Sequence, residues 1–278
     1  MLRARSAFWP ILFLGRCEAS VVCRCPNGCS VLRSRRLSPV ERQLKIHAIN
    51  AVFVHIPRCG GTTVNNTIVA HGLIPGHNQP LRYPDQNHHI LYGHLNINGQ
   101  VLELDHCFAE HIRRYFCSPY ENETFTFFAF LRNPVDRIVS VYRAARQMNN
   151  FRILRDSSVR SFTEFVDGLE TLKSKGYFDA DMKMKIPHNE LSHYVPQSHY
   201  VLDRDGKSLV DVLKNVSDLE STLGELLSSR GVNVSRIMRA NASSPSTTVA
   251  EEEIEKNRLR IRELYASDYD LGIRYPES

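Results

Sequence analysis

The first segment whose residues could carry chemistry reads His55-Ile56-Pro57-Arg58-Cys59-Gly60-Gly61-Thr62-Thr63. A phosphate-like anion needs several backbone N–H groups aimed at one point, and glycines let the backbone come close to it. A helix that begins at such a loop adds the positive end of its dipole, while Thr62 and Thr63 offer hydroxyls and Arg58 a full charge. The segment therefore predicts an anion site, with an ordinary glycine turn as the alternative. It lacks the pattern G-x-x-x-x-G-K-S/T, which argues against a kinase or ATPase.

The second segment begins at Arg132, directly after an apolar run that reads as a buried strand. This is the edge of the sheet at which α/β proteins bind ligands. Ser140 follows eight residues later, about two helical turns on, so both side chains could reach one anion. Arg137 could join them or pair with Asp136 or Glu164. The alternative interpretation of the segment is a solvated amphipathic helix with salt bridges.

Strands and helices alternate around these two segments. Residues 51–56 and 125–131 are apolar and read as buried parallel strands, and weaker strand patterns cover 90–92 and 232–239. Helical patterns cover residues 63–71, 135–148, 162–172, 209–227 and 251–265. We therefore predict an α/β, P-loop-like three-layer fold with a mostly parallel central sheet.

The chain has 278 residues, which suits one domain of two hundred-odd residues and a tail. We predict a leader and linker over residues 1–48 and the folded domain over 49–278. The net charge of +5 favours anionic ligands without choosing among them. Four of the seven cysteines fall between Cys17 and Cys29, but they lack paired C-x-x-C spacing and nearby histidines, so we predict no metal site. Pairing of Cys107 with Cys117 stays open.

The N-terminus combines the basic stretch MLRARS with the short apolar run AFWPILFLG, which is too short to span a bilayer. This resembles a secretory signal, with a transit peptide or a misassigned start as alternatives. N-glycosylation sequons begin at Asn65, Asn122, Asn215, Asn233 and Asn241. We expect a lumenal Golgi or secretory-pathway glycoprotein with membrane association through the N-terminus; chance sequons in a non-secreted protein are the alternative.

Taken together, the two segments resemble the Golgi-type, carbohydrate-directed sulfotransferases that use 3′-phosphoadenosine 5′-phosphosulfate (PAPS). The resemblance is closest to the group with the heparan sulfate 2-O- and 6-O-sulfotransferases. Their loop F-V-H-I-P-K-x-G-G-T-S/T is similar to Phe53–Thr63, and their segment L-R-x-P-x-x-R-x-x-S-x-Y is similar to Leu131–Tyr142. Weaker similarity continues through Pro196-Gln197, Asn241 and residues 265–269, so that it spans about residues 50–275.

The resemblance implies a PAPS co-substrate, no metal and an in-line transfer to a hydroxyl group. The 5′-phosphosulfate would lie against the loop formed by Arg58, Cys59, Gly60, Gly61, Thr62 and Thr63. Arg132 and Ser140 would bind the 3′-phosphate. His94, in Tyr92-Gly93-His94, resembles the general base of the family, and His88 and His89 are rivals for that role.

One position departs from the family, which has Lys where this chain has Arg58. That Lys stabilises the bridging oxygen as sulfate leaves; Arg keeps the charge but is a far poorer proton donor. Two alternatives follow: a PAPS- or PAP-binding protein with little or no turnover, and an ATP-using kinase.

The expected partner is a hydroxyl acceptor on a glycan, and nucleic acid is not expected. Acceptor-binding surfaces would lie in loops such as 73–90 and 144–160. Four arginines suggest an anionic polysaccharide, or else form a solvated helix face: Arg143, Arg146, Arg152 and Arg155.

Overall fold

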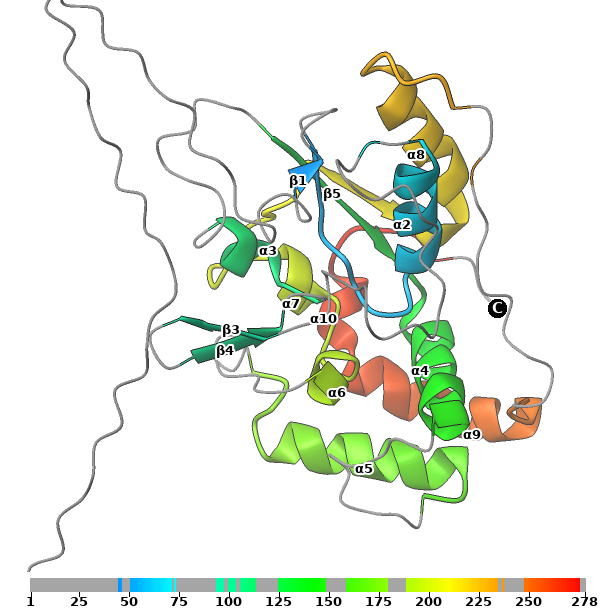
Figure 1. The fold of residues 1–278 in the computed structure, drawn as a ribbon. Helices are drawn as coiled ribbons and strands as arrows, with labels where there is room; N and C mark the ends of the chain where they lie inside the picture. The colour runs from blue at the N-terminus through cyan, green and yellow to red at the C-terminus, as the bar shows by residue number, and fades with distance from the viewer. Residues whose placement is uncertain are drawn as a thin grey trace, which may run out of the picture. The chain divides into compact units, whose positions relative to one another are not determined.

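The computed structural model describes residues 45–46, 51–71, 73, 94–97, 100–103, 106–113, 125–148, 159–179, 189–234, 237 and 248–275 (Figure 1). These residues lie in a unit that spans Ser38–Ser278. In chain order the elements are β1 (Lys45–Ile46), β2 (Ala51–Phe53), α2 (Gly61–Ala70), β3 (His94–Ile97), β4 (Gln100–Glu103), α3 (Ala109–His111), β5 (Thr126–Leu131), α4 (Pro134–Met148), α5 (Phe162–Ser174), α6 (Asn189–Ser192), α7 (Ser198–Val201), β6 (Val212–Asn215), the 3-10 turn η5 (Val216–Asp218), α8 (Leu219–Ser228), α9 (Glu251–Leu264) and α10 (Ala266–Tyr269).

The central sheet has four strands in the order β1-β2-β5-β6. Strand β2 pairs in parallel with β5, and β5 pairs in parallel with β6, while β1 lies antiparallel to β2. The register places Phe53 opposite Phe128 and Phe128 opposite Val212. The prediction of a mostly parallel sheet is therefore confirmed. Strands β3 and β4 form a separate antiparallel pair.

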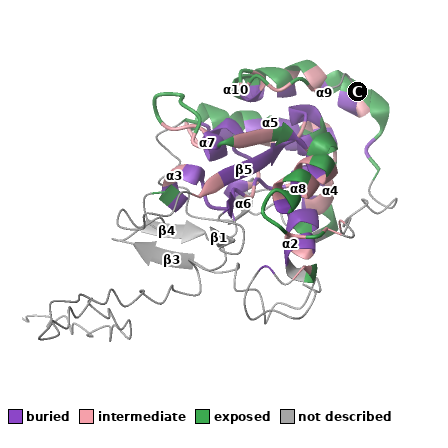
Figure 2. Cartoon of the chain, turned by 90° about the horizontal axis from the view of Figure 1, so that it is seen from above, coloured by how far each residue is buried: buried purple, intermediate pink, exposed green. Residues whose placement is uncertain are grey.

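Alternate residues of the strands enter two different apolar clusters, as the two-residue period of a strand requires. Phe53, Phe128 and Phe130 pack with leucines and valines of α2 and α8, which lie side by side in Figure 1. The opposite set, which includes Phe127 and Leu131, joins the cluster of α4, α5 and α9. Both faces of the sheet are thus covered, and β5 is buried along most of its length (Figure 2). The predicted three-layer α/β fold is confirmed.

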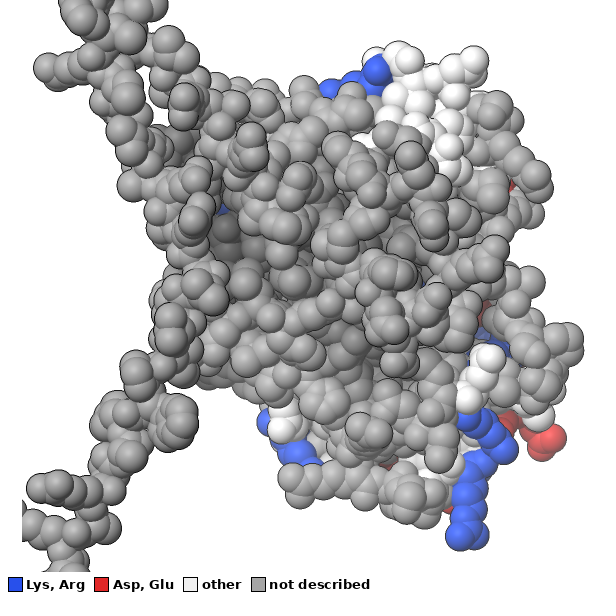
Figure 3. All heavy atoms as spheres, viewed as in Figure 1, with Lys and Arg blue, Asp and Glu red and all other residues white. Residues whose placement is uncertain are grey.

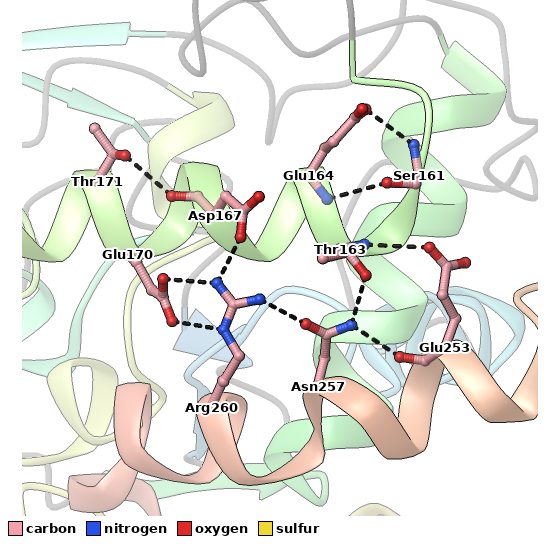
Figure 4. Close-up of polar contacts among 9 residues, drawn as sticks. All are labelled: Ser161, Thr163, Glu164, Asp167, Glu170, Thr171, Glu253, Asn257 and Arg260. Carbon is pink, nitrogen blue, oxygen red and sulfur yellow. Dashed lines mark hydrogen bonds and ion pairs between the residues drawn. The ribbon is translucent and has the colours of Figure 1, made fainter.

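A network of polar side chains joins helix α5 to helix α9 (Figure 4). Arg260 donates from Nε to Glu170 at 2.8 Å and from Nη2 to Asp167 at 2.5 Å. Asn257, which is fully buried, donates from Nδ2 to Thr163 Oγ1 at 2.9 Å. The two-pronged arginine contact is the geometry in which a partly exposed ion pair contributes most. The network fixes α9 against α5, and α10 follows α9 directly.

Two sequence expectations are wrong. The helix expected over residues 209–227 is instead strand β6, turn η5 and helix α8. Val212–Asn215 becomes a strand because β5 offers a parallel edge beside it. Asn215 then accepts a hydrogen bond from Ser217 N at 3.0 Å and starts the following turn. The described residues of the expected strand 232–239 lie in no strand.

Other expectations hold with shifted bounds or fall outside the description. Helix α2 begins two residues earlier than predicted, and β2 ends at Phe53, although Val54 N still donates to Phe128 O at 2.9 Å. Strand β1 lies within the segment expected to be a linker. The expected strand 90–92, the loop 73–90 apart from Leu73, and the leader up to residue 44 lie outside the described residues. No described helix is long and apolar enough to cross a membrane.

Candidate functional site

The glycine loop links β2 to α2 through a tight turn. Cys59 N donates to Ile56 O at 3.2 Å, Pro57 takes the second position, and Arg58 has a φ of +67°. Pro followed by a residue with positive φ is the pattern of a type II turn, in which glycine usually takes the place that Arg58 takes here. A non-glycine residue in that conformation carries strain on the order of 1 kcal/mol or more, which the surrounding contacts must offset.

The N-terminal N–H groups of α2 point toward this loop. The first helical hydrogen bond runs from Val64 N to Gly60 O at 3.1 Å, and the first turn of α2 holds no acidic residue. Thr62 is exposed there, and Thr63 is largely buried. The turn therefore presents backbone donors and the positive end of the helix dipole without a carboxylate to compete for them.

Both glycines are required by close contacts. Gly60 has a φ of +85°, and a Cβ there would lie 2.3 Å from Leu219 Cδ1. A Cβ on Gly61 would lie 1.8 Å from His55 Nε2, because the imidazole ring covers this position. The pair of glycines thus lets α8 and His55 pack directly onto the loop.

The structure brings the two predicted segments together. Arg58 Nε donates to Ser140 Oγ at 3.0 Å, and Arg132 Nη1 donates to Arg58 O at 3.3 Å. Ser140 is 5% exposed on α4, while Arg132 is half-buried at the end of β5. Two guanidinium groups and a hydroxyl therefore lie together beside the N-terminus of α2. The contact between Arg58 and Ser140 joins residues that are 82 positions apart in the sequence.

Arg137 contacts the backbone of the glycine loop. It is fully buried and donates from Nε to Pro57 O at 3.3 Å and from Nη2 to His193 O at 3.0 Å. Glu164, one of its expected partners, instead accepts from Ser161 N at 3.2 Å. The interpretation of a solvated helix face is therefore wrong at Arg137. Its guanidinium instead supports the turn of the glycine loop by donating to the carbonyl of Pro57.

Cys59 faces the protein interior. Its thiol is 1% exposed and donates to Gln197 Oε1 at 3.1 Å. Burial raises the pKa of the thiol to about 11, against the opposing charges of Arg137 and Arg132. Cys59 can therefore contribute only its backbone to the anion site. Gln197 was indicated by nothing in the sequence beyond the weak similarity around Pro196-Gln197.

Three histidine rings lie next to one another beside the loop: His55, which begins the first segment, and His106 and His193, for which the sequence predicted no role. The rings of His55 and His106 lie 4.6 Å apart, and those of His106 and His193 lie 4.8 Å apart, both edge to face. Burial, followed by the charges of Arg58, Arg137 and His55, lowers the pKa of His193 to about 3. Burial also lowers the pKa of His106 well below its ordinary value, and the neighbouring histidines lower it further. Both rings are therefore neutral near pH 7.

The expected base, His94, is the first residue of β3, where the structure describes its backbone only. Its rivals His88 and His89 lie outside the described residues. Within the described ranges, no group of three or more His, Cys, Asp or Glu side chains is arranged to hold a metal ion.

Comparison with known proteins identifies the family. A family model described as the sulfotransferase family matches residues 47–271, which is most of the chain and includes every residue of the site described above. No curated protein and no solved structure gives a significant match. The matched range, the α/β fold and the convergence of the two segments agree, and the chain is a member of the sulfotransferase family, whose chemistry is sulfuryl transfer.

Proposed function

We propose that this chain transfers a sulfuryl group from PAPS to a hydroxyl group of a glycan. The observation that carries the proposal is the contact between Arg58 and Ser140, because it joins the glycine loop to the segment that begins at Arg132. A donor with a 5′-phosphosulfate and a 3′-phosphate needs two neighbouring anion subsites. The loop at the start of α2 supplies one, and Arg132 with Ser140 supplies the other.

Arg58 lies between the two subsites. Its Nε donates to Ser140 Oγ, so a 3′-phosphate that binds there competes for the serine hydroxyl. Release of Ser140 would free Arg58 to contact the bridging oxygen of the donor. A guanidinium can hold two oxygens at once and stays charged throughout, so it stabilises the departing phosphate by charge rather than by giving up a proton.

The proposed reaction is an in-line displacement at sulfur. The acceptor oxygen forms a bond to sulfur while the bond from sulfur to the bridging oxygen breaks, and the electron pair of that bond stays on the 5′-phosphate of PAP. A neutral histidine takes the acceptor's proton, and we propose His94 for that role. Backbone N–H groups of α2, Thr62, Thr63 and Arg58 stabilise the charge that develops on the leaving phosphate.

Calorimetry with PAP and with ATP tests the donor site directly. We expect PAP to bind more tightly than ATP, and Arg132→Ala to weaken PAP by about tenfold or more, because a charged contact to the 3′-phosphate is lost. Tighter binding of ATP than of PAP would refute the PAPS site and favour a kinase. Unchanged PAP affinity in Arg132→Ala would remove Arg132 from the site.

A second candidate function is a protein that binds PAPS or PAP without turnover. One observation favours it: Arg58 stands where the similar enzymes have Lys. Radiolabelled PAPS and a panel of glycan acceptors, assayed with the natural chain and with Arg58→Lys, separate the two functions. Transfer by the natural chain supports the enzyme, whereas transfer by Arg58→Lys alone supports the binding protein.

We also propose a lumenal location in the Golgi and an anionic glycan acceptor. On the face drawn in Figure 3, the Lys and Arg side chains of the described residues lie at several separate places. Among the described sequons, Asn215 is 7% exposed and Asn65 lies on α2, while Asn233 is exposed outside any helix or strand. Glycan mapping on the secreted or Golgi-resident protein should therefore find Asn233 occupied and Asn215 unmodified; an unmodified Asn233 speaks against the lumenal location.

A further inference from the structure

We infer that Gln197, held by Asp268, is a positioning residue that sets the geometry of the 3′-phosphate subsite; the inference rests on the proposed PAPS-binding function. Gln197 is fully buried, whereas Thr62 at the start of α2 is exposed. It acts instead through the two segments that form the site, because its side-chain amide contacts both of them.

The amide of Gln197 uses its full hydrogen-bonding capacity. Oε1 accepts from Arg132 N at 2.9 Å and from Cys59 Sγ at 3.1 Å. Nε2 donates to Arg132 O at 2.9 Å and to Asp268 Oδ2 at 3.2 Å. A side-chain amide has two acceptor and two donor positions, so this fully buried group has none left over. Rotating the amide by 180° would set donor against donor, so only one orientation satisfies all four contacts.

These contacts fix the point from which the Arg132 side chain departs. Both the N–H and the carbonyl of Arg132 bind the same amide, directly after the last residue of β5. The same oxygen that accepts from Arg132 also accepts from Cys59, which precedes Gly60 in the other segment. One amide thus fixes the spacing between the glycine loop and Arg132, and a donor with two anionic groups must match that spacing.

Asp268 holds the amide in this orientation. Its carboxylate is fully buried on α10 and accepts from Gln197 Nε2 and, through Oδ1, from Ser198 N at 2.8 Å. Tyr275 OH also donates to the backbone carbonyl of Asp268 at 3.2 Å. Burial raises the pKa of Asp268, and the charge of the buried Arg137 opposes that rise. Helix α10 is therefore linked to Arg132 through the carboxylate of Asp268 and the side-chain amide of Gln197.

The test compares two nucleotides that differ in the 3′-phosphate alone, PAP and adenosine 5′-monophosphate. The ratio of their dissociation constants reports the contribution of that phosphate, and a uniform loss of folded protein leaves the ratio unchanged. In the full chain, Gln197→Leu should reduce the ratio by about tenfold or more, because contacts to charged groups contribute at this level. Tyr265→Phe is a matched control: it removes a buried hydrogen bond to Tyr194 O at 2.6 Å but touches neither Gln197 nor Arg132. Its ratio should equal that of the natural chain.

Exchanging the amide and the carboxylate between positions 197 and 268 tests the role of Asp268, and this test does not depend on Gln197→Leu being folded. Gln197→Glu keeps the acceptor for Arg132 N but sets two carboxylates against each other at Asp268, so the ratio should fall. Adding Asp268→Asn restores the contact with the donor and acceptor exchanged, so the ratio should recover in part.

The outcomes separate the inference from the proposed function. The inference is overturned if the ratio is unchanged in both Gln197 variants or does not recover in the double variant. If the natural chain still prefers PAP in that case, the proposed donor site stands. A natural chain that binds both nucleotides equally refutes the 3′-phosphate subsite itself.

Discussion

Lowering the pH from about 7 to about 5 should destabilise the folded chain, because the fold holds His106 and His193 in neutral form. Their pKa values lie below the ordinary value of 6.5, which both side chains regain when the chain unfolds. Below pH 6.5 the unfolded chain therefore binds protons that the folded chain does not take up. The stability of the folded state is largest above that pH and falls as the pH drops toward the folded pKa, which is about 3 for His193.

The size of the effect follows from the gap between the two states. For His193, whose folded pKa is about 3, the cost is roughly 1.4 kcal/mol per pH unit below 6.5, so a fall to pH 5 removes about 2 kcal/mol. The lowered pKa of His106 adds a loss in the same direction. Asp268 acts in the opposite direction. Its pKa is raised by burial, so its protonation favours the folded state as the pH falls and offsets part of this loss.

Urea unfolding of the full chain, followed by far-ultraviolet circular dichroism at pH 7, 6 and 5, measures the unfolding free energy. Replacing one ring, as in His193→Asn, should remove about 2 kcal/mol of the pH dependence without altering its sign. Asp268→Asn should make the loss at low pH larger, because the offsetting group is gone. An unfolding free energy that is equal at pH 7 and pH 5, or a dependence unchanged in His193→Asn, would falsify the assignment of buried neutral histidines.

Three further predictions concern the loop and its support. Gly61→Ala should cost roughly 1–3 kcal/mol of stability and weaken PAP binding, because the added Cβ meets the His55 ring; adding His55→Ala should recover part of the loss in urea unfolding, and additive losses would contradict the contact. Arg137→Met should lower the unfolding free energy by about 3 kcal/mol, since the carbonyls of Pro57 and His193 lose the hydrogen bonds from this guanidinium, and a stable variant would show that these contacts are dispensable. Cys59 should react with a thiol reagent only after unfolding, because its thiol is buried and its pKa is about 11; mass spectrometry that finds Cys59 modified in the native chain contradicts this.

Elements with a continuous buried pattern could be predicted from the sequence. Strand β5 and helices α4, α5 and α9 match their expected positions to within about two residues. The segment Val212–Asn215 could not be recognised, because its apolar spacing suits a helix and only the neighbouring edge of β5 makes it a strand. The information that decides such a segment lies in a partner far away in the sequence.

The same division applies to the site. The loop at Gly60 and Gly61, with Arg132 and Ser140, could be predicted because each motif lies within a dozen residues. The burial of Arg137 and the contacts of Gln197 depend on segments from other parts of the chain, which no local pattern encodes. The proposed role of His94 stays a prediction.

The contacts of Gln197 also have a consequence for the order in which the protein is made. Gln197 bonds to Cys59 across 138 residues and to Asp268 across 71. A nascent chain that has emerged from the ribosome only through β5 already contains the glycine loop and Arg132, which follow the paired strands β2 and β5, but it still lacks Gln197 and Asp268. Contacts between such distant residues form slowly and last. The contacts that we infer to position Arg132 are therefore complete only when α10 has been synthesised.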